Sequence, residues 1–362
     1  MNRLNRYRDS LNKFIKDRSC LLNAVTVPLP DTDPNINVIL QNKIKNSDLI
    51  LPILFLTIMN SQNKKNNVSI QGYFTAASME FMSIIIDIME NKGSFVNNYG
   101  IRTYEEIIHH LIMATFKSIQ QNLNSIKNSI TLEKAYNMHN DIMNIYFENF
   151  NNKNILSSHI FTLSDRKPHD DLSRWYFKNN QEYKDKYNKI IQIQRESFNN
   201  YVNKKLGSLV EIVMTVGWIM GCGDDKYLHN IKKISKYFAM FYKLFKDFNN
   251  LEVDLDENLD GVSSNYVINY GLQDSYEIFM YNKQKFIQEC MMIDIYTGTI
   301  KEIVNFIDKN VENIIDQTSP DLKSNFSNFV STDNNLGTNS PDMDEILEKV
   351  TKKNYRKKRT NK

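Results

Sequence analysis

Residues 204–254 contain the feature that most constrains the fold: two stretches of apolar residues at helical spacing, separated by a glycine-containing turn. In each stretch the apolar residues recur every three or four positions, which is typical of a helix with one buried face. The turn between them contains Gly221, Gly223 and Asp224. Two such helices need further helices to cover their apolar faces. The apolar positions are Leu209, Ile212, Val213, Val216 and Ile219 in the first stretch, and Leu228, Ile231, Ile234, Phe238 and Phe241 in the second.

The rest of the chain predicts an all-α protein. Only 11 glycines and 7 prolines occur in 362 residues, and most apolar residues lie at helical spacing. We expect an N-terminal helix and loop over 1–37, one helical domain over 38–318, and a disordered polar tail with a basic end over 319–362. Helices are expected at 1–27, 38–59, 72–93, 103–126, 131–150, 173–200, 265–288 and 289–316, and polar loops at 27–35, 61–69 and 151–172.

Charge and composition limit the function classes. The net charge of +3 is too small to predict nucleic-acid binding. The basic run 352–359 is a solvated tail in the simplest interpretation, and a nuclear address, a nucleic-acid contact or an anionic-membrane contact are the alternatives. The richness in Asn, Lys and Ile suggests an AT-rich genome, as in giant viruses and some protists.

The sequence predicts a cytoplasmic protein that is not secreted and has no membrane span. The most apolar run, 49–59, is shorter than the roughly 20 residues that a membrane helix needs. The basic N-terminus has no apolar core of signal-peptide length. It predicts an amphipathic helix, with a mitochondrial transit peptide as the alternative. Cys20, Cys222 and Cys290 match no metal-binding spacing, which favours a reducing intracellular setting.

Four blocks of this helical sequence resemble, in order and in spacing, the trans-prenyl diphosphate synthases. The first, 46–59, keeps the family's proline as Pro52 before an apolar run. The second, 76–101, resembles the helix with the first Asp-rich motif. The third, 204–225, resembles the family's K-T-G helix, with Lys205 and Gly207 in place. The fourth, 238–250, lies where the second Asp-rich motif belongs. The resemblance implies the isoprenoid-synthase fold, a bundle of about ten helices around a central cavity, usually as a dimer.

In the first Asp-rich motif only one of the three family carboxylates remains. Asp87 occupies the leading position, Ile88 replaces the second acid and Asn91 the last, while Glu90 is an extra acid at a different spacing. In the family, the two Asp-rich motifs hold Mg²⁺ ions that draw the diphosphate from an allylic substrate. This segment therefore lacks most of the carboxylates that such a cluster needs.

The second Asp-rich motif is also degraded. Lys246 stands in place of the first acid, Asp247 keeps the second and Asn250 replaces the third. An ammonium group in this position would repel Mg²⁺ at close range. Against the motif of terpene synthases, only Asp247 and Asp254 match. We expect Lys246 to form an ion pair with Asp87 across the cavity, because a cation there would take the place of the metal.

The residues that would bind diphosphate are reduced to three lysines. Lys205 is the retained family residue, Lys92 is what remains of an Arg-Arg pair, and Lys243 replaces the family glutamine. Asp48 and Leu51 stand where the family has basic residues before the proline. The fold determinants are thus kept while most metal and phosphate ligands are lost.

Three function classes follow from this pattern. The first is a non-catalytic partner or regulatory subunit in polyprenyl diphosphate synthesis, forming a homodimer or a heterodimer with a synthase whose motifs are complete. The second is an active isoprenoid or terpene synthase with a remodelled metal site. It would use Mg²⁺, with Asp87 and Asp247 as ligands. The third is a helical scaffold or binding protein unrelated to isoprenoids. The first class needs no cofactor. Met and Phe side chains offer an apolar cavity for an isoprenoid or lipid, or simply fill the core.

Overall fold

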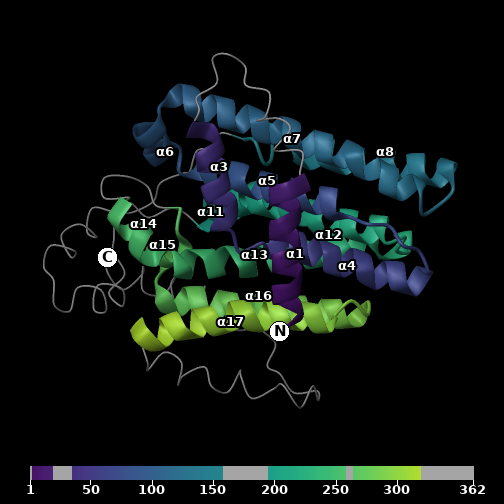
Figure 1. The fold of residues 1–362 in the computed structure, drawn as a ribbon. Coiled ribbons are helices and arrows are strands. Elements are labelled where there is room, and N and C mark those ends of the chain that lie inside the picture. Colours follow the sequence, from purple (N-terminus) through teal and green to yellow (C-terminus); the bar gives the residue numbers. More distant parts are fainter. Residues whose placement is uncertain (1, 19–34, 158–194, 258–263, 319–362) are drawn as a thin grey trace, which may run out of the picture. The chain divides into compact units, whose positions relative to one another are not determined.

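The computed structural model describes residues 2–18, 35–157, 195–257 and 264–318, which are helical and contain no β-strand (Figure 1). The predicted all-α fold class is confirmed. The chain divides into residues 1–311 and 312–362. In the second unit the structure describes only 312–318, the end of the last helix. The α-helices are α1 (Arg3–Arg18), α3 (Asn35–Lys45), α4 (Ile50–Asn66), α5 (Tyr73–Glu90), α6 (Lys92–Tyr99), α7 (Ile101–Lys127), α8 (Leu132–Asn149), α11 (Arg195–Val202), α12 (Ser208–Met220), α13 (Leu228–Asn249), α14 (Leu251–Glu257), α15 (Tyr266–Tyr270), α16 (Leu272–Met292) and α17 (Gly298–Thr318).

Helix α12 lies at the centre of the first unit, in contact with α4, α5, α8 and α13. The sequence predicts that α12 buries one face, whereas the structure buries almost its whole circumference. Every residue from Ser208 to Met220 is buried except Glu211 and Ile219, which are half-buried. A helix enclosed on most sides needs apolar or small residues around its whole circumference. A π-helical turn, Asn203–Gly207, precedes α12, and a 3₁₀ turn, Asp225–Tyr227, lies between α12 and α13.

Two glycines of the α12 segment allow α4 to approach closely. A Cβ atom on Gly221 would lie 2.4 Å from the Cβ atom of Gln62 and 2.7 Å from the carbonyl oxygen of Met59. A Cβ atom on Gly217 would lie 3.0 Å from the carbonyl oxygen of Phe55. Backbone atoms of α4 cannot move aside as a flexible side chain can. The packing of these two helices therefore depends on the absence of side chains at 217 and 221.

Replacing Gly221 by alanine is expected to lower the free energy of unfolding by about 1–3 kcal/mol, because the added methyl group overpacks the α4–α12 contact. Urea denaturation measures the change. Gly93→Ala, in α6, is the matched control, since no atom lies within 4 Å of the position that its methyl group would take. Equal stability of the Gly221→Ala protein and the wild type would contradict the close packing described above.

Several helix ends differ from the sequence prediction. The predicted loop 61–69 is wrong, because α4 continues to Asn66 and ends at Asn67, whose left-handed backbone (φ 53°) lets its N–H donate to the carbonyl of Asn63. Gln62 and Asn63 are buried, so polar residues that resemble a loop in sequence are part of the helix interior. The predicted break at 288/289 is also wrong, since α16 runs to Met292.

Other predicted elements are confirmed or lie outside the described residues. The helices predicted at 103–126 and 131–150 are α7 and α8, and the two predicted around the glycine turn are α12 and α13. Most of the predicted loops at 27–35 and 151–172, the end of the predicted helix at 1–27, most of the helix at 173–200 and the tail at 319–362 lie outside the described residues. Within the described part of the chain, no helix combines the length and apolarity that crossing a membrane requires.

Candidate functional site

The segment that resembles the first Asp-rich motif lies at the C-terminal end of α5. Asp87 forms an ion pair of 2.6 Å with Lys43 of α3, and Asn91 donates from Nδ2 to the carboxylate of Asp87 at 3.3 Å. The side chain of Asp87 is 44% exposed. Glu90, one turn further along, accepts a hydrogen bond from the Tyr201 hydroxyl of α11. Asp87 and the extra acid Glu90 thus both have partners within the chain.

The ion pair predicted between Lys246 and Asp87 is not formed, because Asp87 pairs with Lys43 instead. Lys246, on α13, lies with its Nζ 5.3 Å from the centre of the Tyr242 ring. Burial alone would lower the pKa of Lys246, but the charges of Asp48, Asp87 and further acids outweigh it and leave this pKa raised. Lys246 therefore places a positive charge near Asp48 and Asp87 without forming an ion pair with Asp87.

Asp48 lies in the segment before α4, and its charge is one of those that raise the pKa of Lys246. The Tyr242 hydroxyl donates to both its carboxylate oxygens, at 3.0 and 2.9 Å, and Arg8 of α1 donates to its carbonyl oxygen at 3.2 Å. The family has a basic residue at this position that contacts diphosphate, according to the resemblance. Here the position carries an acid that is held by Tyr242, and an anionic substrate group would be repelled by it.

The segment that resembles the second Asp-rich motif contains a buried ion pair. Lys243 Nζ lies 2.7 Å from Asp247 Oδ1, one helical turn apart on α13, and the two side chains are only 10% and 4% exposed. The other carboxylate oxygen, Oδ2, accepts the backbone N–H of Tyr266 at 2.9 Å. Burial alone would lower the pKa of Lys243, but the nearby charges of Asp247 and Glu90 leave it raised. The carboxylate of Asp247 is therefore held at both oxygens by groups of its own chain.

The end of α13 is fixed by Asn265, which precedes α15. Its Nδ2 donates to the carbonyl oxygen of Asp247 and to Asp254 Oδ2, both at 2.7 Å. Asn250 is exposed at the end of α13, where its N–H donates to the carbonyl of Lys246. Neither Asp254 nor Asn250 is placed here as a free ligand next to Asp247.

The lysines predicted to remain from the diphosphate site are engaged elsewhere. Lys205 is 4% exposed, and its Nζ donates to the carbonyl oxygens of Ile155, at 3.0 Å, and Ser157. Burial lowers the pKa of Lys205. Lys92, at the start of α6, lies with its Nζ 5.1 Å from the centre of the Tyr104 ring. Only Lys243 belongs to the same cluster as the acids.

Glu80 is a buried acid that the sequence interpretation missed. It lies two turns before Asp87 on the same face of α5 and is 2% exposed. Burial raises the pKa of Glu80 to about 7, and the negative charges of Asp48 and Asp87 add to this effect, while Ser47 and Lys246 oppose it. The spacing of seven residues from Asp87 is the signal that could have indicated it. We call Asp48, Glu80, Asp87, Lys243, Lys246 and Asp247 the motif cluster.

The motif cluster does not fit the Mg²⁺ sites of the family. No group of three or more acidic, His or Cys side chains in the described residues has an arrangement that could hold a metal ion. Mg²⁺ needs carboxylate oxygens that are free to coordinate. Here Asp247 and Asp87 each bind a lysine, and Lys246 adds a further positive charge. In the described residues both carboxylates are thus engaged in ion pairs with lysines of the same chain.

Comparisons with known proteins agree with the fold. The sequence matches no protein-family model and no curated protein. The structure is similar to a geranyltransferase from Helicobacter pylori complexed with magnesium and isoprenyl diphosphate, with a TM-score of 0.56 and 12% identity over 86% of this chain and 99% of that one. It is also similar to a proposed farnesyl-diphosphate synthase from Marinomonas sp. MED121 (TM-score 0.54, 10% identity, 85% and 99% covered) and to an FPP/GFPP synthase from Zymomonas mobilis (TM-score 0.51, 10% identity, 83% and 95% covered). The chain has the all-helical fold of the isoprenyl diphosphate synthases.

Proposed function

We propose that this chain is a non-catalytic, isoprenoid-synthase-like subunit that associates with a catalytically complete prenyl diphosphate synthase. The buried Lys243–Asp247 ion pair is the observation that carries the proposal. Binding of Mg²⁺ by Asp247 would require this pair to break and would leave Lys243 charged, buried and next to the metal. Breaking a buried ion pair costs several kcal/mol, which opposes metal binding at this position.

The other members of the motif cluster support the same conclusion. Asp48 replaces a basic residue of the family and would repel a diphosphate. Lys246 replaces a metal-binding acid and would repel Mg²⁺. Asp48 is negative where the resemblance implies a basic residue for diphosphate, and Lys246 is positive where it implies an acid for Mg²⁺. A remodelled active enzyme would need a different set of free carboxylates.

An exposed apolar surface on α7 and α8 supports a role as a subunit. Met113 and Phe147 are 66% and 57% exposed, and Phe147 stacks on Phe116 of α7 with ring centroids 5.8 Å apart. Leu132 and Tyr136 continue the apolar stripe at helical spacing along α8. Exposed apolar side chains gathered on adjacent helices are typical of protein–protein contacts. We propose that this α7/α8 surface binds a second chain with the same fold.

The purified chain is expected to form no product from isopentenyl diphosphate and an allylic diphosphate in the presence of Mg²⁺. A prenyl synthase with complete Asp-rich motifs, from the same organism, is assayed in parallel as the positive control. Mixing the two chains is expected to give a heteromer in analytical ultracentrifugation, with changed product length or rate. Turnover by the isolated chain that is lost in Asp87→Asn would contradict the proposal, since this exposed substitution removes one remaining acid without disturbing the core.

The α7/α8 surface is tested with a matched pair of variants. Phe147→Glu places a charge on the proposed interface and is expected to abolish the heteromer. Met292→Glu alters a side chain of α16 that is 74% exposed and lies off this surface, so the heteromer should persist. Loss of association in both variants, or in neither, would show that the chain associates through another surface or not at all.

A further inference from the structure

Helix α11 is a short surface helix with one buried face, and it contacts the π-helical turn and α13 (Figure 1). Asn199 and Asn200 are exposed, whereas Phe198, Tyr201 and Val202 are buried. The three buried residues are spaced by three and four positions and therefore lie on the same face of the helix. A helix of this kind stands between solvent and the side chains beneath it.

The ring of Phe198 lies against the buried Lys243–Asp247 ion pair. Its centroid is 5.8 Å from Lys243 Nζ and 5.0 Å from the centroid of the Tyr266 ring. Tyr266 also donates its backbone N–H to Asp247, and the ring of Tyr270 lies 6.2 Å from that of Phe198. An ammonium group is attracted to an aromatic face, and the ring keeps water away from it. Phe198 therefore covers the pair on the side of α11.

Tyr201 attaches the same helix to the end of α5. Its hydroxyl donates to Glu90 Oε1. Burial and the charge of Glu90 raise the pKa of Tyr201 well above its usual value, so the hydroxyl keeps its proton and remains a donor. Hydrogen bonds to a carboxylate are stronger than those between neutral groups. Because Glu90 is exposed, this bond lies at the boundary with solvent, and its loss would weaken the attachment of α11 to α5.

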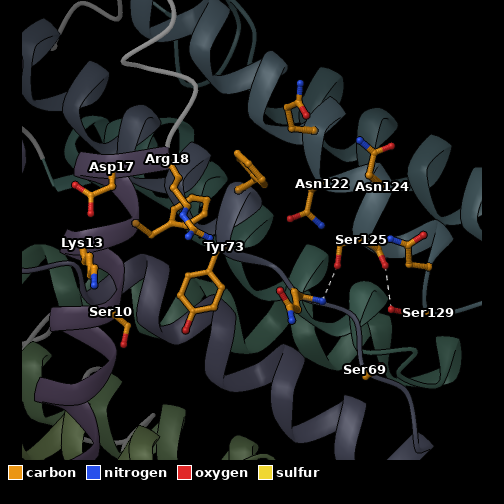
Figure 2. Close-up of a pocket in the computed structure, with 15 residues that line it drawn as sticks. Ser10, Lys13, Asp17, Arg18, Ser69, Tyr73, Asn122, Asn124, Ser125 and Ser129 are labelled. Atoms are coloured by element: carbon orange, nitrogen blue, oxygen red, sulfur yellow. Dashed lines mark hydrogen bonds between the residues drawn. The ribbon is translucent and has the colours of Figure 1, made fainter.

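A pocket of about 870 Å³ between α1, the start of α5 and the second half of α7 does not reach the ion pair (Figure 2). Tyr73 lines this pocket, whereas no residue of α11 or of the motif cluster does. Tyr73 and Glu90 are the two ends of α5, which are about 25 Å apart along a helix of this length. Solvent in the pocket is therefore remote from Lys243 and Asp247.

We infer that α11 is a strap that closes the motif cluster. It covers the Lys243–Asp247 pair with Phe198, is held by the hydrogen bond from Tyr201 to Glu90, and keeps metal ions and anionic ligands from the pair. Opening of α11 exposes Lys243 while the rest of the bundle stays folded. The inference goes beyond the proposed subunit role, because such a strap acts in the same way in a subunit and in an enzyme.

Acetylation of the full chain, followed by mass spectrometry of its peptides, tests the strap. Lys243 reacts only when α11 has opened and the amine has left Asp247. Tyr201→Phe keeps the ring and removes the hydroxyl, and it is expected to raise the acetylation rate of Lys243 at least about tenfold, the effect of losing a hydrogen bond to a charged group. Glu90→Ala removes the acceptor of the same bond and is expected to act alike. The double variant should react no faster than either single variant, because all three lack one and the same bond.

Two controls separate opening of α11 from overall unfolding. Lys283 of α16 is an internal reference, since its 2.7 Å pair with Asp308 of α17 leaves its side chain only 15% exposed, and its acetylation rate should not change. Tyr99→Phe makes the same substitution at a tyrosine of α6 that is 49% exposed, and it should leave Lys243 protected. Hydrogen exchange of the α11 amides is a second readout that does not depend on the charge of Glu90, and it is expected to become faster in both variants.

A selective rise at Lys243 in both variants, with faster amide exchange in α11, supports the strap. An unchanged Lys243 rate in either variant, effects that add in the double variant, or unchanged exchange in α11 would overturn it. Parallel rises at Lys243 and Lys283 would overturn it as well, because overall unfolding would then be the cause. The measurements use neither a partner nor a substrate. Turnover by the isolated chain would therefore contradict the proposed function and leave the strap standing.

Discussion

Replacing Asp247 by asparagine is expected to lower the free energy of unfolding by about 3–5 kcal/mol, because it leaves the ammonium group of Lys243 buried without its counter-charge. The two atoms of the pair lie 2.7 Å apart, and both side chains are almost fully buried. Asparagine has nearly the same volume as aspartate, so the loss reports the missing charge, together with one of the two hydrogen bonds that Asp247 accepts, rather than a cavity. Urea denaturation followed by circular dichroism measures it.

A double variant separates the charge effect from other causes. Lys243→Met combined with Asp247→Leu replaces the ion pair by apolar side chains and is expected to recover part of the lost stability, because the buried charge is gone but the Tyr266 N–H loses its acceptor. Asp294→Asn is the surface control, since the pair of Asp294 with Lys65 lies in solvent and asparagine tolerates the left-handed backbone of this residue (φ 55°), and it should change stability little. If the double variant were as unstable as Asp247→Asn, the buried charge would not be the cause.

Replacing Glu80 by glutamine is expected to stabilise the protein at pH 8 relative to the wild type, and to have little effect at pH 4. The pKa of Glu80 is raised from 4.5 to about 7 by burial and by neighbouring acids. A difference of that size in one carboxyl group corresponds to about 3 kcal/mol. The folded protein therefore binds the proton of Glu80 more tightly than the unfolded chain does.

The direction follows from proton linkage. A carboxyl whose folded pKa is raised contributes its full stability below the unfolded value, near 4.5, and loses it as the pH rises towards 7. Glutamine mimics the protonated form and lacks this loss. Denaturation of both proteins at intervals between pH 4 and pH 8 gives the difference, with the exposed Glu133→Gln as the control for removing one carboxylate. A difference that stays constant with pH would contradict the burial effect on Glu80.

The fold could be predicted well from the sequence because its determinants are local. Helical spacing identified α7, α8, α12 and α13, and the glycines near 221 indicated the turn between the last two. The ends of α4 and α16 could not be predicted, because Gln62 and Asn63 look like loop residues until the burial around them is known. Whether α12 is covered on one side or on all sides depends on the packing of helices distant in sequence.

The candidate site was predicted only in part. The sequence interpretation of Asp87 and Asp247 as motif remnants stays a prediction, while the structure pairs each of these acids with a lysine. It did not give the correct partner of Asp87, since nothing in the sequence near Lys43 connects it with α5. Ion-pair partners within one helix, such as Lys243 and Asp247 at a spacing of four, can be inferred from sequence. Partners on different helices require the tertiary structure.

The π-helical turn before α12 has a consequence for the direction of the Lys205 side chain. The N–H of Ser208 donates to the carbonyl oxygen of Asn203, five residues earlier. A turn of this kind corresponds to a single residue inserted into an α-helix, and each residue in a helix rotates the chain by about 100°. An uninterrupted helix, one residue shorter, would point Lys205 in a different direction from the carbonyls of Ile155 and Ser157. The buried hydrogen bonds of Lys205 thus depend on the extra residue that this turn accommodates.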